Sequence, residues 1–253
     1  MAQTGKHALV TGGGSGIGLA IAQGLAGAGW RVTITGRNKA KLEAAAKAIS
    51  GVHVETCDVT NADSVRTAVQ AAAKAHGPVQ LLVNNAGGVT SASFEKTSLE
   101  SFRQTIDLNL MGTVNSIHAV LPQMKESGWG RIVNVASTAG LTGYRYVSAY
   151  VAAKHAVVGL TKALALELAK TGITINAVCP GYTDTDVIAS AVRTISKSSG
   201  RTESEALATF TATNPQGRLI KPEEVAAAVL WLASDGAAAV NGIALPIAGG
   251  EVS

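Results

Sequence analysis

Short apolar runs rich in β-branched residues alternate with alanine-rich stretches of helical period along the whole sequence. The runs lie at 7–11, 30–35, 52–57, 79–83, 131–136, 173–179 and 243–247, and the helical stretches at 16–28, 38–49, 61–76, 98–126, 148–170, within 184–213 and at 222–234. This alternation is typical of a parallel sheet with helices on both faces. Because crossovers between parallel strands are right-handed, we expect an α/β fold with a doubly wound, seven-stranded parallel sheet.

Length and composition fit a single domain of this kind. A chain of 253 residues is ordinary for one α/β domain, so we expect one Rossmann-type domain over 1–253. Hydrophobic residues make up 47% of the chain but come in short runs, which predicts no membrane span. The first ten residues, MAQTGKHALV, resemble neither a secretory signal nor a transit peptide, which predicts a cytoplasmic protein.

Charge and cysteine content argue against two other classes of protein. The net charge is only +4 and aromatic residues make up 4% of the chain, too few for a nucleic-acid stacking surface, so we expect no nucleic-acid partner. Cys57 and Cys179 lie in strand-like runs without a CxxC spacing. We therefore expect two reduced core residues and no metal site.

A glycine-rich turn joins the first predicted strand to the first predicted helix. The sequence from 11 to 18 is TGGGSGIG, and glycine lets a backbone approach a pyrophosphate closely while the free N–H groups of a helix face it. A plain tight turn is the alternative. We expect a dinucleotide phosphate site here, formed by Gly12, Ser15, Gly16, Ile17 and Gly18.

The end of the second predicted strand bears on which dinucleotide binds. An acidic residue there would hydrogen-bond the ribose 2′-OH, but the sequence has Gly36 followed by Arg37. A cation at this position favours NADP(H), while NAD(H) stays possible. The alternative is that Arg37 is simply a solvated charge at the start of a helix. Gly14 stands where many NADP-binding proteins carry a second basic residue, so the preference need not be complete.

Two further strand ends supply candidate contacts to the nucleoside parts of the cofactor. Asp58 and Val59 follow the third strand and could meet the adenine, although a turn or N-cap aspartate is the ordinary alternative. Asn85, Ala86 and Gly87 follow the fourth strand and could let a ribose lie against the backbone, although they could equally form an ordinary turn.

A tyrosine and a lysine lie four residues apart in SAYVAAK, at 148–154. On a helix, Tyr150 and Lys154 share one face. A free phenol has a pKa of about 10, and a neighbouring ammonium group would lower it, which makes the phenol usable as an acid or base. Ser137 ends the fifth strand, so its hydroxyl could reach the same cavity; a turn serine is the alternative.

Taken together, these motifs resemble the short-chain dehydrogenase/reductase family. TGGGSGIG, CDV, NNAG, the Asn109 of DLNL, NVAS, YVAAK and CPG occur in order over essentially the whole chain. The resemblance implies that Tyr150 is the catalytic acid/base, that Ser137 orients the substrate, and that Lys154 lowers the tyrosine pKa and binds the nicotinamide ribose. It also implies that Asn109 distorts its helix and holds a water that joins Lys154 to solvent. The segment beside the nicotinamide would comprise Pro180, Gly181, Thr183 and Thr185.

The same resemblance suggests an activity and an assembly. It implies a catalytic domain over 1–253 that reversibly reduces a ketone with NADPH, with a substrate-specificity segment at about 182–215 and a homotetramer built on the 98–126 and 148–170 helices. The sequence looks most like bacterial polyketide and β-ketoacyl ketoreductases, so the substrate could be a free carbonyl compound or an acyl thioester. The alternatives are an NAD-linked 3-hydroxyacyl-CoA or secondary alcohol dehydrogenase and a non-catalytic dinucleotide sensor.

One charged feature of the specificity segment has two interpretations. Arg193, Lys197 and Arg201 recur every four residues and would form a basic stripe on a helix. Such a stripe could receive the phosphate of a phosphopantetheine or CoA group. A solvated helix face is the other interpretation.

Overall fold

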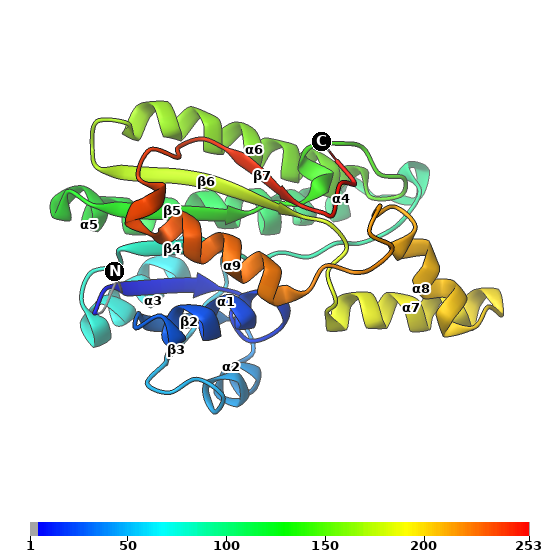
Figure 1. Cartoon of the computed structure of the whole chain (residues 1–253), viewed down its shortest axis with the longest axis horizontal. Helices are drawn as coiled ribbons and strands as arrows, with labels where there is room; N and C mark the ends of the chain where they lie inside the picture. The colour runs from blue at the N-terminus through cyan, green and yellow to red at the C-terminus, as the bar shows by residue number, and fades with distance from the viewer. Residues whose placement is uncertain (1–4, 253) are drawn as a thin grey trace.

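A computed structural model, which describes residues 5–252, contains one seven-stranded sheet with every strand parallel to its neighbours (Figure 1). The strand order is β3-β2-β1-β4-β5-β6-β7, as a doubly wound fold requires. The strands are β1 (His7–Thr11), β2 (Arg31–Gly36), β3 (His53–Thr56), β4 (Leu81–Asn84), β5 (Gly130–Val135), β6 (Ile173–Pro180) and β7 (Ala244–Ile247). The predicted fold is confirmed.

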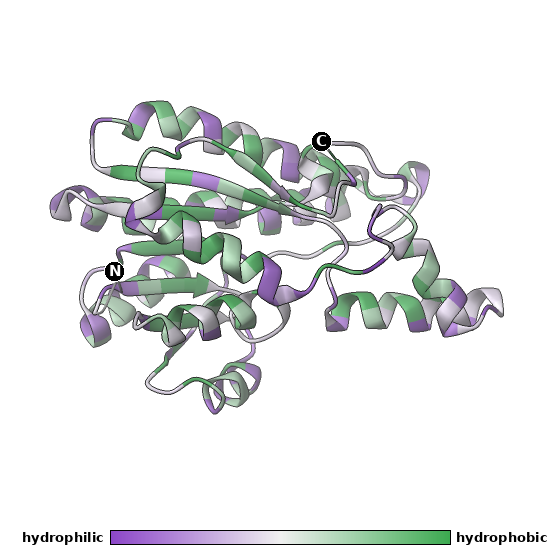
Figure 2. Ribbon diagram, viewed as in Figure 1, coloured by the Kyte–Doolittle hydropathy of each residue, from purple (hydrophilic) through white to green (hydrophobic). Residues whose placement is uncertain are grey.

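Helices cover both faces of the sheet, and each face buries a large hydrophobic core. One core joins the strands to α1 (Gly16–Gly27), α2 (Lys39–Ala46) and α9 (Pro222–Ala233). The other joins them to α3 (Ala62–His76), α5 (Gly112–Ser127) and α6 (Ser148–Leu168). Because both faces are covered, β1, β4, β5 and β6 are buried along their whole length and are mostly hydrophobic (Figure 2).

The sheet order reverses between β1 and β4, and this reversal decides where a ligand can bind. Strands β2 and β3 lie on one side of β1 and strands β4 to β7 on the other, so the loops after β1 and β4 diverge. A crevice at the carboxyl edge results from such divergence. The glycine-rich turn and the NNAG segment leave β1 and β4 at this place.

The predicted helix at 98–126 is interrupted. It consists of α4 (Leu99–Ile106), one π-helical turn (Asp107–Met111) and α5. The predicted helical region within 184–213 consists of α7 (Asp186–Ser199) and α8 (Glu203–Thr211), which project beyond the carboxyl edge of the sheet (Figure 1). Gly200 ends α7 in the left-handed conformation, with φ of 72°.

The fold also bears on the predictions made for the basic residues of 193–201, for the two cysteines and for a membrane span. Arg201 lies beyond the end of α7, so the three basic residues do not form one helical stripe; exposed Arg193 and Lys197 alone share the helix. Cys57 and Cys179 are buried and unbonded, as expected. Within residues 5–252, no helix has both the length and the apolar character needed to cross a membrane.

Candidate active site

The turn after β1 presents the amino end of α1 to the crevice. Gly12 and Gly16 have φ of 66° and 52°, a left-handed conformation that glycine adopts without strain. Ser15 is the N-cap residue, but its side chain makes no capping hydrogen bond, and the first turn of α1 has no acidic residue. The free N–H groups and the positive end of the helix dipole therefore suit an anion such as a pyrophosphate. Ile17 is partly buried against the core beneath this turn.

Thr11 and Asn85 fix the shape of this turn. The Thr11 hydroxyl accepts hydrogen bonds from the backbone N–H groups of Asn85 and Ala86, both at 3.0 Å. The Asn85 amide donates to the backbone oxygens of Thr11 and Gly12, at 3.0 and 3.1 Å, and a Cβ at Gly18 would collide with it. The Asn85 side chain therefore holds the glycine turn. Thr11 was not among the predicted residues, although a polar residue closing an apolar strand was a visible signal.

The expected adenine contacts have structural partners of their own. Oδ1 of Asp58 accepts from the backbone N–H and the hydroxyl of Thr60, at 3.0 and 2.8 Å, which is the turn alternative for an aspartate here. Val59 is 5% exposed and packs against Gly112, where a Cβ would lie 2.7 Å from it. Val59 therefore belongs mainly to the core. Arg37 is exposed at the carboxyl end of β2, at the same edge of the sheet as the glycine turn.

The predicted catalytic side chains lie together at the carboxyl end of β5. Ser137 follows β5, and its hydroxyl accepts from the Ala139 N–H at 3.1 Å and hydrogen-bonds with Tyr150. Lys154 is buried, and its ammonium nitrogen donates to the Val135 oxygen at 2.8 Å. The same nitrogen lies 5.5 Å from the centre of the Tyr150 ring. Helix α6 thus brings the tyrosine and the lysine to one face, as their spacing predicts.

The electrostatics of this cluster differ from the expectation for the tyrosine. Burial raises the pKa of Tyr150, and the hydrogen bond with Ser137 opposes this rise only in part. Burial also lowers the pKa of Lys154 to about 8, because a desolvated ammonium group is disfavoured. In this structure desolvation therefore outweighs any lowering of the phenol pKa by the lysine. Tyr150 is a protonated group, ready to donate.

Asn109 lies in the π-helical turn and is almost completely buried. Its amide nitrogen donates to the backbone oxygens of Gly88 and Thr105, at 2.9 and 3.0 Å, and its oxygen accepts from the Gly88 N–H at 3.2 Å. A Cβ at Gly87 would lie 2.7 Å from the Asn109 oxygen and 3.7 Å from the Lys154 nitrogen. Asn109 thus joins the distorted helix to the loop after β4, beside the lysine.

The segment after β6 closes the other side of the glycine turn. Pro180 ends β6, and Thr183 is buried, with its hydroxyl donating to the Gly181 oxygen at 3.0 Å. Thr185 is the N-cap residue of α7, and a Cβ at Gly16 would lie 3.2 Å from its methyl group. The turn after β1 and the segment after β6 therefore lie against each other at the carboxyl edge of the sheet.

Three aromatic residues that the sequence interpretation did not single out form a cluster next to this segment. The rings of Tyr144 and Tyr182 are 6.2 Å apart, and those of Tyr182 and Phe210 are 5.0 Å apart, both pairs edge to face. Tyr144 lies in the loop between β5 and α6, Tyr182 follows Gly181, and Phe210 is in α8. Their positions in the segments after β5 and β6 were the available signal. We call these three residues the aromatic cluster.

Comparison with known proteins adds three relatives of stated activity. The family described as short chain dehydrogenase matches residues 6–196. The chain is 41% identical to the cyclohexanol dehydrogenase of Acinetobacter sp. (strain SE19) over 94% of this chain and 91% of that protein. It is 37% identical to the acetoacetyl-CoA reductase of Rhizobium meliloti (strain 1021) over 97% of this chain and 98% of that protein. A crystal structure of an actinorhodin polyketide ketoreductase variant with NADPH has a TM-score of 0.94 and 40% identity, covering 99% of this chain and 98% of that one.

Proposed function

The chain belongs to the short-chain dehydrogenase/reductase family of oxidoreductases, and from this premise we propose that it reversibly reduces a ketone to a secondary alcohol with NADPH. The observation that carries the proposal is the meeting of Ser137, Tyr150 and Lys154 beside the uncapped amino end of α1. A non-catalytic dinucleotide sensor would need the glycine turn but has no use for a partly buried phenol next to a lysine.

The proposed mechanism assigns proton transfer to this chain. Hydride transfer is the chemistry that a nicotinamide cofactor supplies when it is bound. Tyr150, held protonated by burial, donates its proton to the oxygen of the ketone as negative charge develops there. Ser137 donates a hydrogen bond to the same oxygen. Lys154 would hold the ribose of the cofactor and would stabilise the phenolate that remains, and Asn109 holds the helix and the loop beside it.

The residues around the crevice fit a nicotinamide dinucleotide, and Arg37 supports the phosphorylated form. The glycine turn suits the pyrophosphate, with the segment containing Pro180, Gly181, Thr183 and Thr185 opposite. Arg37 is an exposed cation at the ribose end of the crevice, where an acidic residue would repel a 2′-phosphate.

Replacement of Arg37 tests this preference. We expect Arg37→Glu to lower kcat/KM with NADPH by about 10- to 100-fold, with much less effect on NADH, because charge-assisted contacts to a phosphate are lost. Lys74→Glu, on an exposed position of α3, is the control with the same change of charge. An equal loss with both cofactors would contradict the assignment to Arg37.

The substrate is proposed as a class only. Free ketones and β-ketoacyl thioesters both remain candidates, because the relatives include a reductase of acetoacetyl-CoA and a dehydrogenase of cyclohexanol. The second candidate function is oxidation of a secondary alcohol or 3-hydroxyacyl-CoA with NAD, and Gly14 is the observation that favours it, since this position lacks a second cation.

A substrate panel with Tyr150→Phe tests the proposed function. Initial rates would be measured for free ketones, β-ketoacyl thioesters and the matching alcohols, each with NADP(H) and NAD(H). We expect ketone reduction with NADPH to be fastest, and Tyr150→Phe to lower kcat by about 100- to 10,000-fold while the cofactor Kd changes little. A wild-type protein that binds the cofactor but turns over no compound would instead support the sensor.

The remaining proposals concern assembly and location. We propose a homotetramer, as the family resemblance implies; on the helices expected to pack between subunits, Leu99 of α4 and Leu166 of α6 are 76% and 83% exposed. Light scattering should then give the mass of four chains. The cytoplasmic location stays a prediction from the N-terminal sequence.

A further inference from the structure

A carboxylate near the C-terminus reaches the loop that carries Tyr144. The phenol oxygen of Tyr144 lies 2.6 Å from Oε1 of Glu251 and 2.8 Å from the hydroxyl oxygen of Thr138. A tyrosine has one hydroxyl proton and a carboxylate can only accept, so Tyr144 donates to Glu251 and Thr138 donates to Tyr144. Burial raises the pKa of Tyr144 most; Glu251 adds to this rise and Thr138 opposes it, in agreement with these donor and acceptor roles.

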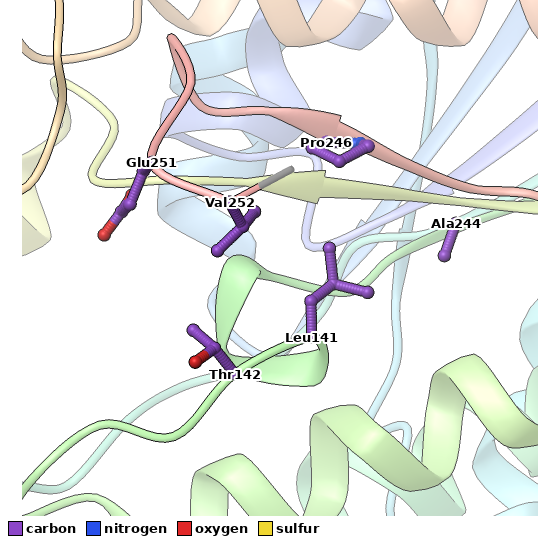
Figure 3. A pocket seen from close by; sticks show the side chains of 6 residues that line it. All are labelled: Leu141, Thr142, Ala244, Pro246, Glu251 and Val252. Carbon is purple, nitrogen blue, oxygen red and sulfur yellow. The ribbon is translucent and has the colours of Figure 1, made fainter.

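The second oxygen of the same carboxylate lies against the segment after β6. A Cβ built on Gly181 would be 2.7 Å from Oε2 of Glu251, so the carboxylate lies directly against this glycine. One side chain thus touches both loops that flank the catalytic cluster. Glu251 also lines an open cleft of about 550 Å³, together with Leu141 and Thr142 of the loop after β5 and with Pro246 and Val252 (Figure 3).

Both contacts of Glu251 lead to the substrate side of the active site. Tyr144 and Tyr182 belong to the aromatic cluster, and Tyr182 is the neighbour of Gly181 in the chain. Thr138 follows Ser137 directly and begins a short turn that ends at Gly140. Gly140 packs on the backbone oxygen of Lys154, which would lie 2.8 Å from a Cβ at this position. The hydrogen-bonded chain from Glu251 through Tyr144 to Thr138 therefore connects the C-terminal segment to the residue beside the substrate-orienting serine.

We propose that Glu251 is a positioning residue that holds the aromatic cluster in place for a cyclic or aromatic ketone. Edge-to-face rings present flat, apolar surfaces that suit a planar substrate and add little for a short linear one. This inference rests on the proposed function, since the aromatic cluster matters to catalysis only if the neighbouring Ser137 and Tyr150 act on a ketone.

Five variants, one of them a control, and two ketones test the inference. We expect Glu251→Ala to lower kcat/KM for the bicyclic ketone β-tetralone about 10-fold or more, mainly through KM, and to change the value for ethyl acetoacetate less than about 3-fold. Glu251→Gln should recover most of the loss, because its amide oxygen still accepts from Tyr144. Tyr144→Phe should reproduce Glu251→Ala, and the double variant should be no worse than either single variant. Glu126→Ala, an exposed carboxylate at the end of α5, is the control.

Two outcomes would overturn the inference. Equal losses for both ketones in Glu251→Ala would indicate general destabilisation, and multiplying losses in the double variant would mean that the two residues act separately. Failure of the proposed function is a distinct result, in which the wild type reduces neither ketone. Ultraviolet titration of the tyrosines tests the contact between Tyr144 and Glu251 itself. The signal of Tyr144 is identified by its loss in Tyr144→Phe, and we expect Tyr144 to ionise at lower pH in Glu251→Ala. An unchanged titration would refute the contact.

Discussion

Lys154 places an ammonium group where charge is unfavourable for the fold. Lys154 is 5% exposed, and its ammonium nitrogen donates to the Val135 backbone oxygen. Burial dominates its pKa, and no carboxylate of the described residues contributes to it. Burial without a counter-ion destabilises the charged form. The residue expected to support catalysis therefore lowers the stability of the free protein, as is common for functional groups.

Replacement of this lysine should stabilise the protein while removing activity. The pKa is about 8 in the folded protein against 10.5 in the unfolded chain, so the unfolded chain binds the proton more tightly and stability rises with pH through this window. At pH 7 the full penalty, about 3 kcal/mol, is present. We expect Lys154→Met to raise the free energy of unfolding at pH 7 by about 2 kcal/mol, once the lost hydrogen bond is subtracted, and the gain to vanish near pH 10.

Urea unfolding between pH 7 and pH 10 checks this expectation. Lys162→Met is the matched control, because it lies on the same helix but is exposed. A stability gain for Lys154→Met that does not depend on pH would mean that the methionine packs better, and would contradict the electrostatic account.

Strand ends and helical spacing predict where the polar residues of the candidate site lie, but they do not predict the groups to which these side chains hydrogen-bond. Tyr150 and Lys154 share a face because helix geometry fixes residues four apart. Asn85 and Asp58 lie at the expected strand ends, yet their side chains bond to backbone and hydroxyl groups of the protein. A short polar side chain in a turn has both options, and only the folded backbone selects between them.

At the scale of elements, the π-helical turn between α4 and α5 is the clearest departure from regular structure. The periodicity of 98–126 predicts one continuous helix, whereas the family resemblance implies a distortion at Asn109. The structure has the distortion there, in the turn Asp107–Met111. Its cause is a contact between segments 21 residues apart, because Asn109 satisfies both backbone groups of Gly88. Periodicity within one helix carries no information about such a contact.

Loss of this side chain should be costly. We expect Asn109→Ala to lower the free energy of unfolding by about 2 to 4 kcal/mol, because three hydrogen bonds between this buried side chain and partly buried backbone groups disappear. Asn115 lies in the adjoining helix α5 and donates one hydrogen bond to the Val59 backbone oxygen, so Asn115→Ala should lower the free energy of unfolding by about 1 kcal/mol. Urea unfolding gives both values, and hydrogen exchange at the Gly88 amide should accelerate only in Asn109→Ala. Equal costs for the two variants would refute this account of the turn.

At the scale of the whole molecule, the alternation of strands and helices was enough to predict the sheet. Parallel strands need long crossovers, and the spacing of the apolar runs allows little else. The same alternation does not predict contacts between side chains of distant segments. Tyr144 and Glu251 are separated by 107 residues, and nothing in either local sequence indicates the other. The same holds at the amino edge of the sheet, where His7, His53 and His76 meet.

The histidines at this edge give the fold a sensitivity to acid that is independent of the active site. The ring of His76 lies 5.3 Å from that of His7 and 5.8 Å from that of His53. His7 is buried; its Nδ1 donates to the Gly77 oxygen at 2.7 Å, so its Nε2 accepts from the Thr33 hydroxyl at 2.9 Å. A second proton would therefore force the Thr33 hydroxyl to turn from donor to acceptor. Burial, with the neighbouring His76, His53 and Arg31, lowers the pKa of His7 to about 4, against the opposing effect of Gly77.

Stability should consequently fall as the pH drops from about 6.5 to about 4, because the unfolded chain takes up a proton that the folded protein refuses. For His7 alone the loss amounts to about 3 kcal/mol, and His76, whose pKa is lowered in the same direction, adds to it. His7→Gln cannot titrate, so we expect a less stable protein at pH 7.5 but a clearly flatter dependence of the unfolding free energy on pH. Urea unfolding from pH 7.5 to pH 4.5 measures that slope, with His155→Gln, an exposed histidine on α6, as the control that keeps the wild-type slope. Parallel curves for wild type and His7→Gln would show that acid acts elsewhere in the molecule.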